Sequence, residues 1–246
     1  MKVSLFIPCS VDAILVDIGK DMVNLMTRLG FDLVYHDEQT CCGQPFYTSG
    51  YIKEAKNAAK KFIEIFEHDE QIVSLSGSCV NMVKNEYPKI LADEPDWLER
   101  ALKLSEKVFE FSQFMVDVAG IVDVKAGFAG KVAYHNSCHL LRALGVKEQP
   151  IQMLAAVQDI ELVPLNSAEE CCGFGGEFSI KYPYISESIV RDKAKNFIAS
   201  GAQVLVLAEP NCLLNINGYL HRYHPGYQAK HIVSFLAENI ERGAKL

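Results

Sequence analysis

The stretch Cys171-Cys172-Gly173-Phe174-Gly175-Gly176 decides how this chain is organised, because its first three residues repeat Cys41-Cys42-Gly43. A lone cysteine precedes each pair and another follows it. In the first set, 31 residues separate the lone cysteine from the pair and 36 separate the pair from the last cysteine; in the second set, the spacings are 32 and 39. The eight cysteines are Cys9, Cys41, Cys42, Cys79, Cys138, Cys171, Cys172 and Cys212. Such near-equal spacing predicts an internal duplication.

The duplication divides the chain near residue 128. We expect residues 1–127 to form the first repeat together with a helical connector, and residues 128–246 to form the second repeat. The connector begins at Pro88, and we predict helices in it over Trp97–Leu104 and Val108–Val118. We interpret this segment as a helical connector and not as a third domain.

Apolar runs of strand length precede the cysteines in both repeats. Each lone cysteine, each pair and each last cysteine follows one such run, and the runs correspond between the repeats. The predicted strands are Val3–Pro8, Phe31–Tyr35 and Gln71–Leu75 in the first repeat, and Val132–His135, Ile160–Val163 and Gln203–Leu207 in the second. The cysteines therefore lie at or beyond the carboxyl ends of strands.

Amphipathic segments alternate with these strands. One stripe, from Val11 to Leu29, has helical spacing and ends at Gly30. Alternation of strand and helix implies parallel strands with right-handed crossovers. We therefore predict an α/β fold of two pseudo-repeated small units with parallel sheets. Because ligands of such sheets bind beyond the carboxyl ends of the strands, the four sulfurs of each unit are expected to converge.

Length and charge exclude several classes of protein. The chain has 246 residues and a formal net charge of −7, which disfavours nucleic acid and anionic membrane surfaces as partners. No run of about 18 apolar residues is present, so we do not expect a membrane-spanning protein. The amino-terminal apolar run stops at Ser10 and reads as a buried strand, which makes the cytoplasm the expected location.

Thiols in a reducing compartment point to metal or redox chemistry before disulfides. Four thiolates suit a structural zinc ion. Structural zinc sites usually contain Cys-x2-Cys knuckles, however, and this sequence contains no Cys-x2-Cys motif. Four cysteines also hold an iron–sulfur cluster, and Gly43, Gly173, Gly175 and Gly176 permit the close backbone approach that a cluster needs. We expect two iron–sulfur clusters, one per repeat, with zinc as the alternative in one or both sites.

Two histidines flank a cysteine of the second repeat. His135 and His139 lie on either side of Cys138, so each is a candidate ligand, or a candidate catalytic proton donor at the edge of the site. A histidine that merely forms a hydrogen bond near a strand end is the alternative. Phosphate-loop, dinucleotide and nucleophile-elbow motifs are absent from the sequence. Any two-electron cofactor is therefore expected on a partner.

The doubled pattern of lone cysteine, Cys-Cys-Gly and final cysteine resembles the CCG cysteine-rich domain family of heterodisulfide reductase B subunits and of glycolate and glycerol-3-phosphate oxidising enzymes. Together with Ile7-Pro8-Cys9 and His135-Asn136-Ser137-Cys138-His139, it most resembles the lactate-utilisation members of that family. This resemblance implies an oxidoreductase subunit that works with a ferredoxin-like iron–sulfur subunit and a LutC-like protein to oxidise L-lactate to pyruvate. Met82 and Asn215 stand where the full heterodisulfide motif has a further cysteine, which favours four-thiolate sites.

Overall fold

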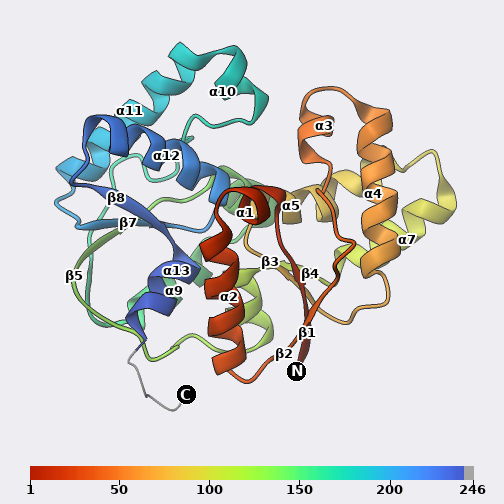
Figure 1. The fold of residues 1–246 in the computed structure, drawn as a ribbon, viewed down its shortest axis with the longest axis horizontal. Helices are drawn as coiled ribbons and strands as arrows, with labels where there is room; N and C mark the ends of the chain where they lie inside the picture. The colour runs from red at the N-terminus through yellow and green to blue at the C-terminus, as the bar shows by residue number, and fades with distance from the viewer. Residues whose placement is uncertain (241–246) are drawn as a thin grey trace.

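A computed structural model describes residues 1–240 and shows two four-stranded parallel sheets (Figure 1). The first sheet has the order β2-β1-β3-β4 and the second has the order β6-β5-β7-β8. β1 in the first sheet and β5 in the second each pair in parallel with both of their neighbours. Phe6 of β1 lies opposite Ser74, and Tyr134 of β5 lies opposite Val206. The predicted α/β fold with two repeated units is therefore confirmed.

The first unit contains strands β1–β4 and the helices between them. Its elements are β1 (Lys2–Phe6), α1 (Cys9–Ala13), α2 (Val16–Arg28), β2 (Asp32–Tyr35), α3 (Gln44–Thr48), α4 (Ile52–Phe66), β3 (Ile72–Ser74), α5 (Gly77–Asn81), π-helix η1 (Met82–Glu86), α6 (Tyr87–Ile90), α7 (Pro95–Ser105), β4 (Val108–Glu110), α8 (Phe111–Gln113) and π-helix η2 (Phe114–Val118).

The second unit follows the same order of strands. Its elements are β5 (Gly127–Tyr134), π-helix η3 (His139–Leu144), α9 (Glu148–Ala155), β6 (Gln158–Leu162), α10 (Glu177–Lys181), α11 (Pro183–Ala199), β7 (Val204–Leu207), α12 (Pro210–Tyr223), β8 (Gln228–His231) and α13 (Ile232–Asn239).

The connector is not wholly helical, so the prediction of a helix over Val108–Val118 was wrong at its start. Val108–Glu110 form β4, which pairs in parallel with β3 and places Val108 opposite Ile72. β8 plays the same part beside β7. Each unit thus has four strands where the sequence indicated three, because β4 (VFE) and β8 (QAKH) contain charged or polar residues and no apolar run of strand length.

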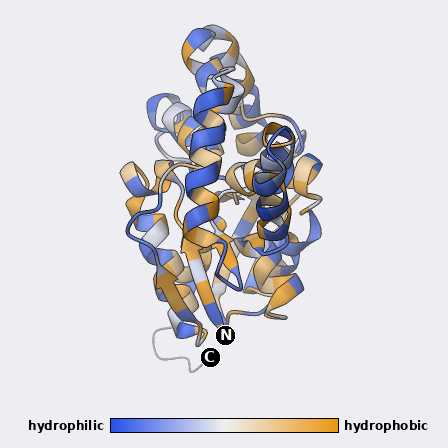
Figure 2. Ribbon diagram, turned by 90° about the vertical axis from the view of Figure 1, so that its right-hand side faces the viewer, coloured by the Kyte–Doolittle hydropathy of each residue, from blue (hydrophilic) through white to orange (hydrophobic). Residues whose placement is uncertain are grey.

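The long helix expected from Val11 to Leu29 is interrupted. α1 ends at Ala13 and α2 begins at Val16, so Val11 is buried while Ile14 is exposed. Within α2, residues at helical spacing form the buried stripe: Ile18, Met22, Leu25 and Met26. Strands are mainly apolar in Figure 2, whereas helices alternate between apolar and polar residues, as burial of one helix face requires.

One hydrophobic core continues from the first unit into the second. It includes Val3 and Leu5 of β1, Val132 and Ala133 of β5, and residues of α2 and α13, which lie side by side in Figure 1. A smaller cluster lies under α4. Within residues 1–240, no helix combines the length and apolar character needed to cross a bilayer.

Candidate metal centres

All eight cysteines lie at or beyond the carboxyl ends of strands, at equivalent places in the two units. Cys9 follows β1 as Cys138 follows β5, and Cys79 lies in α5 after β3 as Cys212 lies in α12 after β7. The Cys-Cys-Gly motifs occupy the loops after β2 and β6. None of the eight forms a disulfide. Thiols that are distant in sequence are therefore gathered at one edge of each sheet.

In the first site, the Cys9 and Cys41 sulfurs are 3.7 Å apart, and the Gly43 N–H points to the Cys41 sulfur at 3.4 Å. Hydrogen bonds from the Cys42 and Cys9 thiols lower the pKa of Cys41 to about 3. Its partners have raised pKa values, because each donates to the Cys41 thiolate. One anionic sulfur is thus held among thiol donors, as in a site ready to bind a cation.

The second site repeats this arrangement. The Cys172 and Cys212 sulfurs are 2.9 Å apart, and the Gly173 N–H points to the Cys171 sulfur at 3.3 Å. Hydrogen bonds from Cys138 and Cys172 lower the pKa of Cys171 to about 2. Cys172 and Cys212 are buried, whereas Cys171 is exposed. The anionic member of the set is therefore again the first cysteine of the Cys-Cys-Gly motif.

The glycine of each motif has a left-handed backbone, with φ of 83° at Gly43 and 85° at Gly173. A Cβ atom at Gly173 would lie 2.7 Å from the Ser186 carbonyl oxygen, and one at Gly43 would lie 2.9 Å from the Ala58 Cβ. These glycines thus permit the loop to turn and to pack tightly against the next helix. Their approach to a cofactor, and that of Gly175 and Gly176, stays a prediction.

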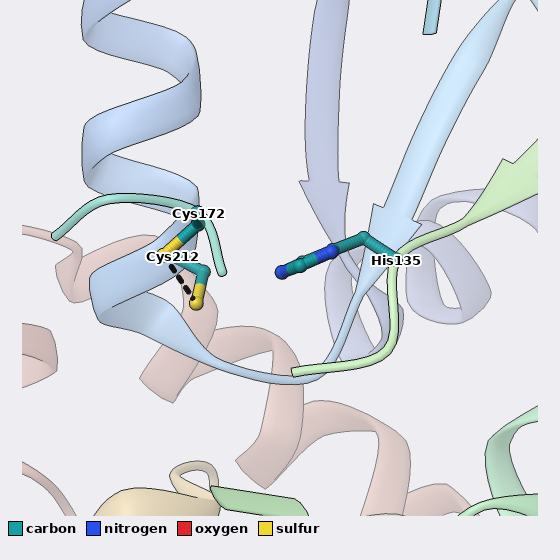
Figure 3. Close-up of side chains that lie close together, drawn as sticks. All are labelled: His135, Cys172 and Cys212. Carbon is teal, nitrogen blue, oxygen red and sulfur yellow. Dashed lines mark hydrogen bonds between the residues drawn. The ribbon is translucent and has the colours of Figure 1, made fainter. Parts of the chain in front are cut away.

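His135 is the histidine that points into the second site (Figure 3). It is fully buried, and its Nδ1 is 3.1 Å from the Ala168 carbonyl oxygen. Because a carbonyl oxygen only accepts hydrogen bonds, Nδ1 carries the ring proton. Its Nε2 has no hydrogen-bond partner. One ring nitrogen and the sulfurs of Cys172 and Cys212 lie within 4.8 Å of one another. Burial lowers the pKa of His135 to about 3, which keeps the ring neutral.

His139 occupies a different environment. It is half-buried at the start of η3, and its Nδ1 is 3.9 Å from the Cys138 sulfur, too long for more than a weak contact. A coordinating or proton-donating role for His139 therefore has no support from a second contact.

The apolar side chains near the Cys-Cys-Gly motifs differ in exposure. Phe46 is exposed, whereas Phe174 packs against the core.

Three buried polar side chains around the thiols were not singled out in the sequence. Tyr87 donates its hydroxyl to the Cys42 carbonyl oxygen at 2.8 Å, Lys193 donates to the Ser167 carbonyl oxygen, and Glu209 caps α12. Of these three residues, only Lys193 could have been recognised as unusual from the sequence. It lies on the buried stripe of α11, where a lysine is out of place unless it has a partner.

The donor sets fit a metal or an iron–sulfur group. Each site has one anionic sulfur that accepts hydrogen bonds from neighbouring thiols, and the second adds a buried histidine nitrogen without a partner. Among residues 1–240, the one set of ligand atoms within 4.8 Å of one another belongs to His135, Cys172 and Cys212. Soft thiolates and imidazole nitrogen are ligands of zinc and of iron in clusters. The unsatisfied nitrogen gives the second site a lone pair that is free for a metal or for a hydrogen-bond donor.

Comparison with known sequences and structures agrees with the duplicated geometry. The profile of the family described as CCG, Cysteine-rich domain, matches residues 3–84 and again residues 132–217. The chain belongs to the CCG cysteine-rich domain family. The two matched ranges begin within β1 and β5, and each contains three strands and the four cysteines of one unit but ends before its fourth strand, β4 or β8.

Relatives within the CCG family align along nearly the whole chain. Lactate utilization protein A of Oceanobacillus iheyensis is 44% identical over 99% of this chain and 99% of its own length. Its namesake in Geobacillus sp. (strain WCH70) is 45% identical over 96% of this chain and 99% of its own length. Lactate utilization protein A 2 of Bacillus cereus (strain 03BB102) is 41% identical over 98% of this chain and 100% of its own length.

A solved structure shares the fold. A hypothetical protein from Helicobacter pylori has a TM-score of 0.70 and 8% identity, and the match covers 99% of this chain but 50% of that one. At this identity the likeness concerns the arrangement of helices and strands alone.

Proposed function

We propose that this protein is an iron–sulfur redox subunit of a complex that oxidises L-lactate to pyruvate, with a ferredoxin-like iron–sulfur subunit and a LutC-like protein as its partners. The observation that carries the proposal is the pair of equivalent four-thiol sites. The substrate is suggested by relatives of equal length that are named lactate utilization protein A. A cytoplasmic location belongs to the proposal, because eight free thiols persist where reductants are abundant.

The roles of the chain's own residues follow from their positions. An iron–sulfur cluster, when bound, supplies single-electron transfer. The four thiols of each unit would hold it, with the N–H groups of Gly43 and Gly173 beside the anionic sulfurs. Cys9 and Cys171 are exposed, so each site opens to the surface on one side and is closed by the core on the other. That arrangement suits exchange of electrons with a partner protein.

Metal content tests this proposal. Protein purified without oxygen should contain iron and acid-labile sulfide at two sites, and it should be brown. Cys41→Ser should remove about half of the iron by emptying the first site, and Cys171→Ser should remove about the other half. Both variants should remain folded, because a core of this size does not depend on metal. Wild-type protein that holds only zinc would instead support a zinc-bound scaffold protein, and loss of all iron in either variant would indicate one shared site.

Turnover tests the need for partners. The sequence carries no flavin or nicotinamide motif, and lactate releases two electrons, so we expect the isolated protein not to reduce a dye with L-lactate. Activity should appear when the two partner proteins are added. Robust turnover by the single chain would contradict this expectation. If the reconstituted complex is inactive with L-lactate but reduces a disulfide, the substrate assignment is wrong and a heterodisulfide-type reaction takes its place.

A further inference from the structure

The two sites share their thiols but differ in the side chains behind them. His135 lies three residues before Cys138, and Phe6 lies three residues before Cys9. Both residues stand at the carboxyl end of the central strand of their sheet, where Phe6 pairs with β3 and the His135 N–H donates to the Val206 carbonyl oxygen of β7. The repeat therefore places a phenyl ring in the first unit where it places an imidazole in the second.

A second pair of positions shows the same exchange. Ser186 of α11 and Ala55 of α4 are equivalent, because each presents its carbonyl oxygen to the glycine of the local Cys-Cys-Gly motif. Lys193 follows Ser186 by seven residues, and Phe62 follows Ala55 by seven. The first unit therefore has two phenyl rings where the second has an imidazole and an ammonium group.

The wall of the first site is apolar. The rings of Phe6 and Phe62 are in edge-to-face contact, with centroids 4.7 Å apart, and belong to one buried cluster with Cys42. Neither phenyl ring has a lone pair for a metal, and the nearby Tyr87 hydroxyl is held by the Cys42 carbonyl oxygen. Sulfur is thus the donor that this wall leaves available.

The wall of the second site carries a nitrogen donor fixed in position. Because the Nδ1–H of His135 donates to the Ala168 carbonyl oxygen, the proton is on that nitrogen and the lone pair is on Nε2. The ring is turned toward Cys172 and Cys212 (Figure 3). A carbonyl that holds the far nitrogen of an imidazole is the usual outer partner of a metal-binding histidine. Nothing in residues 1–240 satisfies Nε2.

Lys193 lowers the net negative charge of the same site. The side chain is buried, and its ammonium group donates to the Ser167 carbonyl oxygen. Burial lowers the pKa of Lys193, while Glu170 and the thiolates of the second site act in the opposite direction, so its charge lies within electrostatic reach of the cysteines. A metal centre beside this cation and a neutral imidazole is less anionic than one surrounded by phenyl rings.

We infer that the two sites are chemically unequal: the first binds its metal through sulfur alone, whereas the second is a mixed imidazole–thiolate centre in which His135 Nε2 is a ligand beside Cys172 and Cys212. This inference rests on the proposed function only in that both sites bind metal. The metal is thiophilic and accepts imidazole nitrogen, which describes an iron of a cluster and a zinc ion alike.

The test uses the full-length protein with one site at a time. Cys41→Ser leaves the second site and Cys171→Ser leaves the first, and each variant is loaded without oxygen, either with iron and sulfide or with zinc. In the iron arm, pulsed EPR of the reduced protein should show strong coupling to ¹⁴N in Cys41→Ser and not in Cys171→Ser. In the zinc arm, X-ray absorption should show a nitrogen neighbour in the same variant only.

Adding His135→Phe, which installs the residue of the first unit, should remove the nitrogen signal and weaken metal binding at the second site by at least about 10-fold. His135→Cys supplies another soft donor and should restore binding without the nitrogen signal. Circular dichroism establishes that each variant folds, and so does retention of metal in the first site when the same His135 change is made alone, with Cys41 intact. A nitrogen signal that survives His135→Phe overturns the inference. Failure of the wild type to bind either metal overturns the proposed function instead.

Discussion

Glu110 is a fully buried carboxyl group at the end of β4. One oxygen accepts hydrogen bonds from the backbone N–H groups of Ser112 and Gln113, while Oε1 has no partner. Burial raises the pKa of Glu110 from 4.5 to about 7 despite these bonds. The folded protein therefore holds a proton that the unfolded chain releases at lower pH.

We predict that Glu110 makes the folded state less stable as the pH rises from 4.5 toward 7. In that window the folded protein binds more protons than the unfolded chain, so the stabilisation present at low pH is lost, by about 3 kcal/mol in total. Glu110→Gln keeps an acceptor for the N–H groups and does not titrate. Its stability relative to wild type, from urea unfolding, should therefore improve by about that amount between about pH 5 and about pH 8.

Comparison with the wild type is essential to this measurement, because the buried neutral His135 and His231 act in the opposite direction. Their pKa values are lowered to about 3 and about 4 by burial, so they destabilise the folded state as the pH falls below 6.5. Both contributions cancel in the difference between Glu110→Gln and wild type. An unchanged difference across the pH range would show that Glu110 is already ionised in the folded protein.

Helix α5 of the first unit packs against η3 of the second unit, close to a cysteine of each site. α5 contains Cys79 and η3 begins after Cys138, and Gly77 of α5 packs directly on Leu140 of η3. A Cβ atom at Gly77 would lie 1.8 Å from the Leu140 Cδ1 atom and 2.7 Å from its Cγ. Leu140 is fully buried and has no free space to move into.

We predict that Gly77→Ala destabilises the protein by about 1–3 kcal/mol, because overpacking forces these two elements apart. It should also lower the metal content of both sites, since α5 contains Cys79 and η3 begins directly after Cys138. Gly218→Ala is the matched control, because nothing lies within 4 Å of a Cβ atom there in the middle of α12. That change should stabilise the protein by about 0.5–1 kcal/mol. Equal urea midpoints for the two variants would contradict the packing argument.

The elements that the sequence predicted correctly are those with a strong local pattern. The buried stripe of α2 has a helical period, β1 and β7 are nearly continuous apolar runs, and the cysteine spacing revealed the repeat before any element was assigned. β4 and β8 were missed because they lack an apolar run, and their strand conformation depends on pairing with β3 and β7. The sequence could not predict which nitrogen of His135 carries the lone pair, since that depends on the hydrogen bond to the carbonyl of Ala168, 33 residues away in sequence. Patterns report local structure, whereas these features depend on tertiary contacts.

Two buried hydrogen-bonded contacts join the units across their shared core. His231 at the end of β8 has its Nε2 3.0 Å from the Leu75 carbonyl oxygen, while its Nδ1 accepts from the Val233 N–H, so the Nε2–H donates. Glu209, after β7, accepts from the Ser78 N–H at 2.9 Å and from the Ser76 hydroxyl at 3.0 Å. These two buried contacts thus lie next to the helices that hold Cys79 and Cys212.

Glu209 gives a prediction that concerns both units at once. The carboxylate is fully buried and caps α12, so Glu209→Ala leaves the Ser78 N–H without its acceptor and α12 without its cap. The expected cost is about 2–4 kcal/mol, measured by urea unfolding of the metal-free protein.

The same variant should lose metal from both sites, unlike Cys41→Ser, because Ser78 precedes Cys79 and Glu209 begins the helix of Cys212. Glu209→Gln retains an acceptor oxygen and should be milder in both measurements. Combining Glu209→Ala with Ser76→Ala should cost less than the sum of the single changes, because the two residues share a hydrogen bond. Strict additivity, or loss of metal from the second site alone, would mean that Glu209 acts only as the cap of α12 and that the two centres are held independently.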